Sequence, residues 1–331
     1  MKILFAIQGT GNGHLSRARD VYPELARYGD VDVLVSGIQA DVQVPFPIKY
    51  RLYGMSFIFG KRGGVDIALT ARKLKLLQLI KDIRQFPIEN YDLVINDFEP
   101  VSAWACKLKK KPCISLSHQC AVLHPNAPKP QNGDPMGELI LKRYAPTTHA
   151  YGFHFKNFGE NIFTPIIRQE IRNITPVNNG HYAVYLPAYD DATIVKHLSH
   201  FGDVRWEVFS KHNKQPFVSG SISVQPIDNT AFIRSLATSA GALLGAGFEG
   251  PAEAMYLGKK VLAIPMQTQY EQHCNAAGAA AMGATIVNAL HEKHYPVIKN
   301  WIDNGQPPLV NYPDITKEII AKIIQTHAPQ N

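Results

Sequence analysis

Residues 247–275 read GFEGPAEAMYLGKKVLAIPMQTQYEQHCN. A glycine turn precedes a helical stretch, which is followed by an apolar run typical of a buried strand and by a polar loop that opens a second helix. Two helix N-termini would therefore face one place, and each carries acidic or amide side chains. Because helix N-termini attract anions, this segment predicts a site for a ligand with both phosphate and hydroxyl groups.

Short apolar runs alternate with helical periods on both sides of this segment. Such buried runs, separated by helices, are typical of a doubly wound parallel sheet in an α/β fold. The runs that we predict as strands are residues 3–7, 31–35, 91–97, 113–116, 181–186, 205–209, 241–244 and 260–264.

The pattern weakens between residues 157 and 180, where proline, asparagine and glycine accumulate. A chain of 331 residues also exceeds the usual size of one hydrophobic core. We therefore predict two Rossmann-like domains that face a cleft. The predicted parts are an N-terminal domain at 1–156, a linker at 157–180, a C-terminal domain at 181–310 and, at 311–331, a final helix that packs back across the domains.

Composition excludes several classes of protein. The chain is 45% hydrophobic and 18% charged, as ordinary globular proteins are. No apolar run approaches the roughly 20 residues of a membrane span, and the apolar start runs into a glycine loop rather than a cleavage site. We therefore expect a cytoplasmic protein. The four scattered cysteines predict reduced thiols, with no metal site and no cofactor.

The net charge of +7 arises partly from basic clusters at residues 61–84 and 107–111. Solvated helix faces are the ordinary explanation for such clusters. The alternative is a basic N-terminal surface that contacts an acidic acceptor or anionic lipid, peripherally at the inner membrane face. Bases and aromatic residues do not alternate as they do in single-strand nucleic-acid grooves, so we expect no nucleic-acid partner.

Residues 8–14, QGTGNGH, link the first strand to the first helix. The glycines let backbone N–H groups approach a ligand, so we predict that Gly11, Asn12 and Gly13 line the acceptor side or a diphosphate. The loop does not fit the dinucleotide pattern, because His14 stands where a small residue should allow close packing. The strand at 31–35 also lacks the acid that would bind a ribose.

His14 is a candidate catalytic base. In the first turn of a helix the dipole favours the neutral imidazole, which accepts a proton from an attacking hydroxyl. Asp97 and Glu99 follow one predicted strand, and His118 and Gln119 follow the next, at the sheet edge where ligands bind. Asp97 or Glu99 could orient His14 or be the base itself. The alternatives are local packing for His14 and helix capping for the strand-end residues.

The C-terminal segment supplies the candidate donor site. Free N–H groups at Gly247, Phe248, Glu249 and Gly250 would hold a pyrophosphate. Glu253, in the first helical turn, would accept hydrogen bonds from two ribose hydroxyls, or it complements the helix dipole.

The second helix N-terminus of this segment carries Glu271 and Gln272. Residues 268–271 also fit a capping box, which would explain Glu271 without a ligand. Gln272 has no such explanation.

These motifs together resemble the GT-B glycosyltransferases, and most closely the family-28 group that includes the peptidoglycan N-acetylglucosaminyl transferase. The resemblance rests on the glycine–histidine loop, on Glu253 and on the segment from Pro265 to Ala276, in the expected order. It implies an inverting, metal-independent transferase that uses a nucleotide-diphosphate sugar, usually linked to UDP. By position it implies that Glu253 binds ribose and that Glu271 and Gln272 contact donor sugar hydroxyls.

The acceptor would be a glycan or a lipid-linked molecule. Two other functions stay open on the same fold. One is a nucleotide-sugar epimerase or hydrolase, which needs no acceptor. The other is a non-catalytic nucleotide-sugar-binding protein, suggested by Gln8 and Asn12 where glycines are usual.

Overall fold

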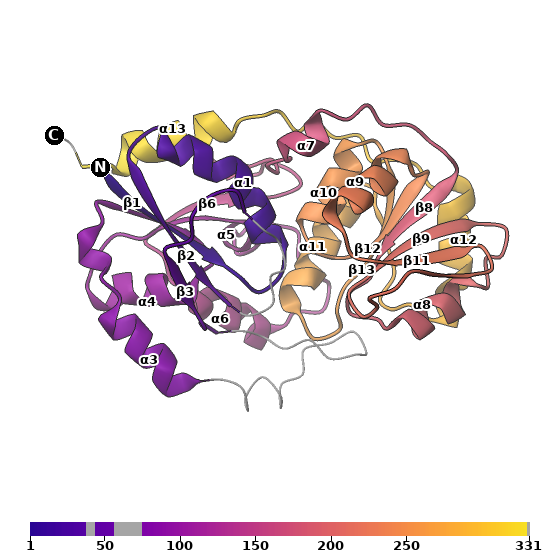
Figure 1. Cartoon of the computed structure of the whole chain (residues 1–331), viewed down its shortest axis with the longest axis horizontal. Coiled ribbons are helices and arrows are strands. Elements are labelled where there is room, and N and C mark those ends of the chain that lie inside the picture. Colours follow the sequence, from indigo (N-terminus) through magenta and orange to yellow (C-terminus); the bar gives the residue numbers. More distant parts are fainter. Residues whose placement is uncertain (38–43, 56–74, 330–331) are drawn as a thin grey trace.

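Two seven-stranded sheets form the framework of the protein, side by side in the computed structural model (Figure 1). The structure describes residues 1–37, 44–55 and 75–329. Helices flank both sheets, so the predicted doubly wound α/β architecture is confirmed.

The first sheet is parallel throughout, in the order β3-β2-β1-β4-β5-β6-β7. Its central strands are apolar on both faces, as strands covered by helices on each side must be. The strands are β1 (Lys2–Gln8), β2 (Asp30–Ser36), β3 (Tyr50–Leu52), β4 (Leu93–Asp97), β5 (Ile114–Ser117), β6 (His149–Phe153) and β7 (Ile162–Phe163).

The second sheet has the order β10-β11-β9-β8-β12-β13-β14 and is parallel except for the antiparallel pair β10–β11. Trp206 of the sheet and Trp301 of the helix at Tyr295–Asn304 are fully buried in the core on this sheet. The strands are β8 (His181–Tyr185), β9 (Arg205–Ser210), β10 (Phe217–Ser219), β11 (Ile222–Pro226), β12 (Gly241–Gly245), β13 (Lys260–Ile264) and β14 (Thr285–Ile286).

The helices of the first domain begin where the sequence supplies a cap or a glycine turn. Glu99, Ser117 and Asp134 cap α4, α5 and α6 through their side chains. The helices as far as the linker are α1 (Gly13–Ala26), α3 (Leu76–Gln85), α4 (Pro100–Leu108), α5 (His118–Val122), α6 (Pro135–Tyr144) and α7 (Gln169–Arg172).

In the second domain, Asp190 and Asp228 cap α8 and α9 in the same way. The remaining helices are α8 (Asp191–Leu198), α9 (Asn229–Thr238), α10 (Glu249–Tyr256), α11 (Tyr270–Ala281), α12 (Tyr295–Asn304) and α13 (Thr316–His327). Two short 3₁₀ turns, η1 (Ile88–Asn90) and η2 (Glu292–His294), complete the described elements.

The last helix returns to the first domain. In Figure 1, α13 lies beside α1, on the far side of the molecule from α8 and α12. Ile319, Ile320 and Ile323 are buried and belong to the same core cluster as the apolar residues of α1. The chain therefore crosses between the domains twice.

Some elements lie where the sequence pattern predicted none. β7 falls inside the segment 157–180 that was predicted as a linker, and it pairs with β6 of the first sheet. The β10–β11 hairpin and α6 were also not predicted, because they are short or lack a clear apolar period. The domain boundaries given above stay a prediction.

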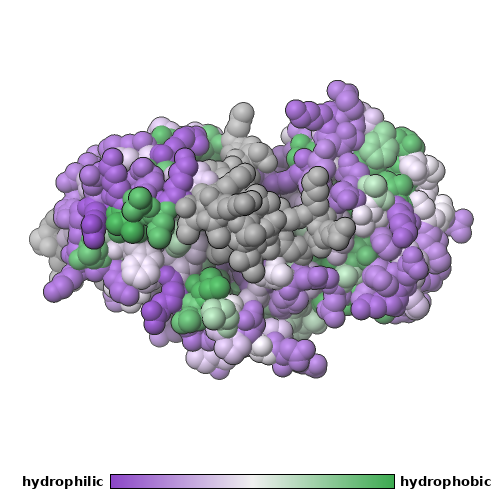
Figure 2. Space-filling model, turned by 90° about the horizontal axis from the view of Figure 1, so that it is seen from below, coloured by the Kyte–Doolittle hydropathy of each residue, from purple (hydrophilic) through white to green (hydrophobic). Residues whose placement is uncertain are grey.

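Figure 2 views the face on which α3 and α6 lie. Among the coloured residues of this face hydrophilic ones predominate, and separate hydrophobic patches lie on both halves. Exposed large apolar side chains occur on α3 at Leu76, Leu77 and Ile80, and on α6 at Met136 and Leu139. Of the helices among the described residues, none has both the length and the apolar character that crossing a bilayer requires.

Candidate active site

The candidate site lies where the strand order of each sheet reverses. In the first sheet this point is between β1 and β4, and in the second between β8 and β12. Ligands of open α/β sheets bind beyond the carboxyl ends of the strands at such points. Ile7 of β1 is in register with Asp97 of β4, so the glycine loop after β1 lies next to Asp97.

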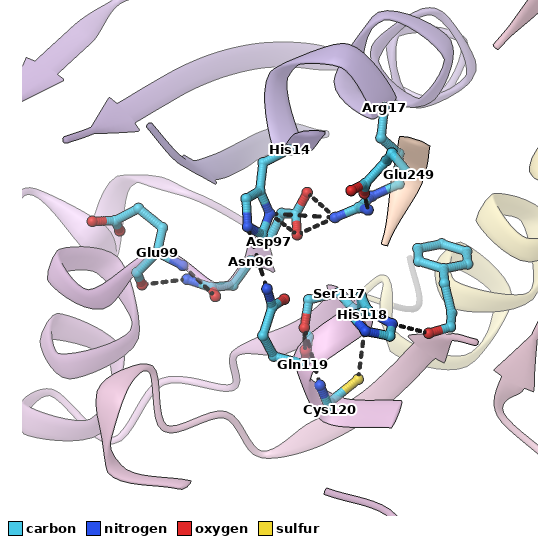
Figure 3. A network of polar contacts seen from close by, with 12 residues as sticks. His14, Arg17, Asn96, Asp97, Glu99, Ser117, His118, Gln119, Cys120 and Glu249 are labelled. Atoms are coloured by element: carbon cyan, nitrogen blue, oxygen red, sulfur yellow. Dashed lines mark hydrogen bonds and ion pairs between the residues drawn. The ribbon is translucent and has the colours of Figure 1, made fainter. Parts of the chain in front are cut away.

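His14 and Asp97 form a close pair at this edge (Figure 3). His14 Nδ1 is 2.8 Å from Asp97 Oδ1, and the Asp97 side chain is only 2% exposed. Burial alone would lower the pKa of His14, but the Asp97 carboxylate outweighs burial and raises that pKa above its ordinary value. The expected effect of the helix dipole, which favours the neutral ring, is therefore not the dominant one here.

Arg17 completes this cluster, and the sequence analysis missed it. Its side chain is 2% exposed, and its Nη2 lies 2.7 Å from both carboxylate oxygens of Asp97. Burial would raise the pKa of Asp97, but Arg17 first and His14 second hold it below the usual range. Arg17 lies one helical turn after His14, on the same face of α1, and this spacing is the signal that could have identified it.

Glu249 brings the second domain to this cluster. Arg17 Nη1 donates a hydrogen bond to Glu249 Oε1 across the domain boundary. The Glu249 carboxylate also lies against Gly13, where a Cβ atom would collide with it. Gly11, with φ of +106°, gives the loop a backbone conformation that other residues rarely adopt, and Asn12 is the N-cap of α1.

Gln119 connects His14 with the other predicted donor residues. Its Nε2 lies 3.3 Å from His14 Nε2 and donates to Glu271 Oε1 at 3.0 Å. The helix α11 begins at Tyr270, with Gln269 as its N-cap and no side-chain capping bond. Gln269, and not the Thr268 of the predicted capping box, is thus the N-cap, and the Glu271 carboxylate contacts the first domain through Gln119.

Two further contacts cross the boundary beside Gln119. His118 is buried with its ring stacked on Phe248, at a centroid distance of 3.8 Å, and its Nε2 lies 2.6 Å from Asn275 Oδ1. Asn275 Nδ2 in turn donates to the Ala246 carbonyl, which fixes the loop before α10. In this structure Phe248 and His118 thus hold the domains together at the floor of the site.

Gln272 and the glycines Gly247 and Gly250 belong to the donor-side loops. Gln272 Oε1 accepts a hydrogen bond from the Met266 backbone N–H at 2.9 Å, so part of this side chain shapes its own loop. Gly247 precedes α10, and Gly250 is its second residue. A small cavity of about 10 Å³ lies at the ends of β8, β12 and β13, and Gly245 and Met266 are among the residues that line it.

Glu253 is buried and paired with Arg168, which the sequence analysis also missed. Arg168 Nε and Nη2 lie 2.5 and 2.8 Å from the two carboxylate oxygens of Glu253. Arg168 Nη1 also contacts Glu170 at 2.6 Å and Asn229 at 2.9 Å. Arg168 and Glu170 line a cavity of about 560 Å³, together with residues of α1 and of the start of α13.

Glu99 has a structural role as the N-cap of α4. It is fully buried, and its carboxylate accepts hydrogen bonds from the N–H groups of Val101 and Ser102 and from the Ser36 hydroxyl. Burial raises its pKa. In Figure 3 it points away from His14, so Glu99 caps α4 and does not orient the histidine.

Comparisons with known proteins place this geometry in context. A family model described as "Glycosyl transferase family 1" matches residues 1–304. No curated protein matches the sequence closely enough to count as a relative.

Solved structures share the fold over nearly the whole chain. MurG of Acinetobacter baumannii has a TM-score of 0.56 at 15% identity, covering 98% of this chain and 99% of its own. A UDP-N-acetylglucosamine 2-epimerase has a TM-score of 0.56 at 13% identity, and the match covers 99% of this chain and 96% of the epimerase. The glycosyltransferase SnogD of Streptomyces nogalater has a TM-score of 0.53 at 11% identity, and the match covers 99% of this chain and 96% of SnogD. At these identities the likeness establishes the GT-B fold.

The contact between His14 and Asp97 predicts a titration behaviour. In Asp97→Asn the imidazolium loses its carboxylate while burial remains, so the pKa of His14 should fall. The measurement is an NMR titration of the histidine ring signals, with the His14 signal identified by its loss in His14→Gln. Asp30→Asn, on the exposed start of β2, is the control. An unchanged His14 titration in Asp97→Asn would contradict the pairing.

Proposed function

Because the chain belongs to glycosyl transferase family 1, we propose that it moves a sugar from a nucleotide-diphosphate donor to an acceptor hydroxyl with inversion at the anomeric carbon. The observation that carries this proposal is the His14–Asp97 pair, held against a second domain that presents a helix N-terminus and a row of acidic and amide side chains.

His14 is the proposed base. Asp97 can only accept a proton at its ionised oxygens, so His14 Nδ1 carries hydrogen and Nε2 is left as the acceptor. A hydroxyl that donates to Nε2 becomes nucleophilic as its proton moves to the ring. Asp97, held ionised by Arg17, orients the ring and stabilises the imidazolium. Asp97 therefore has a positioning role in this proposal rather than the role of the base.

The donor is proposed to bind the second domain. The N-terminus of α10 and the N–H groups of residues 247–250 would receive the diphosphate, in place of a metal ion. Glu253 would bind the ribose, and Glu271 and Gln272 would contact hydroxyls of the transferred sugar. A base in one domain and a leaving group in the other suit direct displacement from opposite faces of the sugar, which inverts the anomeric carbon. UDP is the proposed nucleotide.

The acceptor is proposed to be a glycan or a lipid-linked molecule. Support for a lipid surface comes from α3, where exposed Leu76, Leu77 and Ile80 lie near Lys81 and Arg84. The part of the predicted basic surface at residues 61–74 is outside the described residues. We propose a cytoplasmic enzyme that contacts the inner membrane face through α3.

Replacing His14 by Ala should lower the transfer rate by about 10²- to 10⁴-fold, because the acceptor loses its base. Affinity for the nucleotide should change little, since His14 is assigned to the other substrate. The assay would offer UDP-sugars with candidate glycan acceptors in the presence of EDTA, and NMR would identify the anomer formed.

The same assay separates the rival activities. A transferase should leave the donor almost intact without an acceptor, whereas an epimerase or hydrolase would convert it. Retention of the anomeric configuration, or full activity of His14→Ala, would contradict the proposed mechanism.

Glu253 can be tested through the ribose itself. If its carboxylate accepts from both ribose hydroxyls, the protein should bind UDP about tenfold more tightly than 2′-deoxy-UDP, and Glu253→Gln should reduce that preference. Glu170→Gln is the matched control, because it removes the other carboxylate from Arg168. Calorimetry gives both affinities. An unaltered preference in Glu253→Gln would show that Glu253 binds only Arg168.

The lipid contact predicts sedimentation with vesicles. Leu77→Glu, at a side chain 85% exposed, should reduce co-sedimentation with phosphatidylglycerol vesicles, because it adds charge to the apolar contact. Val218→Glu makes a similar change at a 72% exposed position in the second domain and should have no effect. Equal behaviour of the two variants would argue against α3.

A further inference from the structure

Arg17 is a buried cation with two kinds of partner. Asp97, in the same domain, is contacted by Nη2 through both carboxylate oxygens at 2.7 Å. Glu249, in the other domain, is contacted by Nη1 alone. Asp97 is 2% exposed, whereas the Glu249 side chain is 22% exposed. The second partner is thus the accessible and separable one.

The Glu249 carboxylate occupies a place with the features of an anion site. It belongs to the first residue of α10, it contacts the Arg17 guanidinium, and it lies against the glycine loop at Gly13, where no Cβ blocks the approach. Guanidinium groups and glycine loops at helix N-termini are recurrent phosphate-binding elements. Here a side-chain carboxylate fills that place.

We propose that Arg17 binds the diphosphate of the donor, and that Glu249 is a tethered anion which the diphosphate displaces from Arg17. This inference rests on the proposed function and adds to it a residue for the leaving group. A diphosphate carries more charge and more acceptor oxygens than one carboxylate, so it can replace Glu249 at Nη1 while Nη2 keeps its contacts with Asp97.

The position of Arg17 fits the charge changes of the displacement. The bond between the anomeric carbon and the diphosphate oxygen breaks, and its electron pair stays on that oxygen. The acceptor oxygen bonds to the carbon, and its proton passes to His14 Nε2. Arg17 stabilises the charge on the leaving diphosphate and, through Asp97, keeps the base oriented.

Among the arginines near the domain boundary, Arg17 is the one whose partners allow it to bind the diphosphate. The groups facing it are Asp97, Glu249, His14 and the Cys120 thiol. Arg168, the other buried guanidinium of the interface, is committed to Glu253 through two contacts. Arg19 lies two residues further along α1 but pairs with Glu170 at the hinge and is 34% exposed, which makes it a matched control.

The test measures binding of UDP and of GDP by calorimetry. Glu249→Gln removes the competing charge and should bind the nucleoside diphosphate several-fold more tightly. Arg17→Met should bind it about tenfold or more weakly, and the double variant should match Arg17→Met, because the competitor matters only while Arg17 is present. Arg19→Met and Glu318→Gln, an exposed first-turn acid of α13, should bind as the unsubstituted protein does.

Each of the other outcomes overturns a stated part of the proposal. Unchanged or weaker binding by Glu249→Gln overturns the displacement, and it would mean that the ion pair only joins the domains. Equal binding by Arg17→Met and Arg19→Met overturns the role of Arg17. Arg17→Lys is the second variant, for the case that Arg17→Met does not fold. It keeps the positive charge and should retain part of the affinity for the nucleoside diphosphate. Failure of the unsubstituted protein to bind either nucleotide would overturn the proposed function, and this inference with it.

Discussion

The charge of Arg17 is held with almost no contact with water, so the fold around it must supply anions. Asp97 does so from the end of β4, and Glu249 does so from the start of α10 in the other domain. The first contact holds the pKa of Asp97 below its usual range, and Asp97 in turn contacts the ring of His14. The second contact fixes where the two domains meet. One guanidinium therefore links the chemistry of the site to the arrangement of the domains.

The other interdomain contacts repeat this relationship. His118 with Asn275 and Gln119 with Glu271 each join a candidate site residue of one domain to a residue of the other. Arg168, in the segment predicted as a linker, holds the candidate ribose-binding residue Glu253. The interface and the site are thus built from the same side chains. Opening the domains would separate the two halves of the site, and closing them would assemble it.

The sequence predicted what depends on local pattern. Strand periodicity and glycine turns were enough for the central strands of the two sheets but not for their edge strands. The order of the central strands along the chain was enough to bring His14 and Asp97 to one edge. Arg168 was missed because its partner Glu253 is distant in sequence, so that no periodicity marks it. Arg17 was missed although it lies one helical turn after His14, because its partners Asp97 and Glu249 are also distant in sequence. Asp97 ends β4, and Glu99 stands two residues later. The direction of the backbone after β4 makes Glu99 the cap of α4 and leaves the Asp97 side chain toward His14. The dipole argument for His14 failed because a carboxylate 2.8 Å away outweighs a partial charge.

The return of α13 to α1 affects the order in which the protein matures during synthesis. The helix that carries His14 and Arg17 shares a core cluster with Ile319, Ile320 and Ile323. Those residues leave the ribosome only after both sheets have been translated. Until then α1 lacks its packing against α13, and the position of His14 beside Asp97, which depends on α1, is not yet fixed. The first sheet precedes that helix in the chain, but the packing around α1, which carries His14 and Arg17, is completed only with α13.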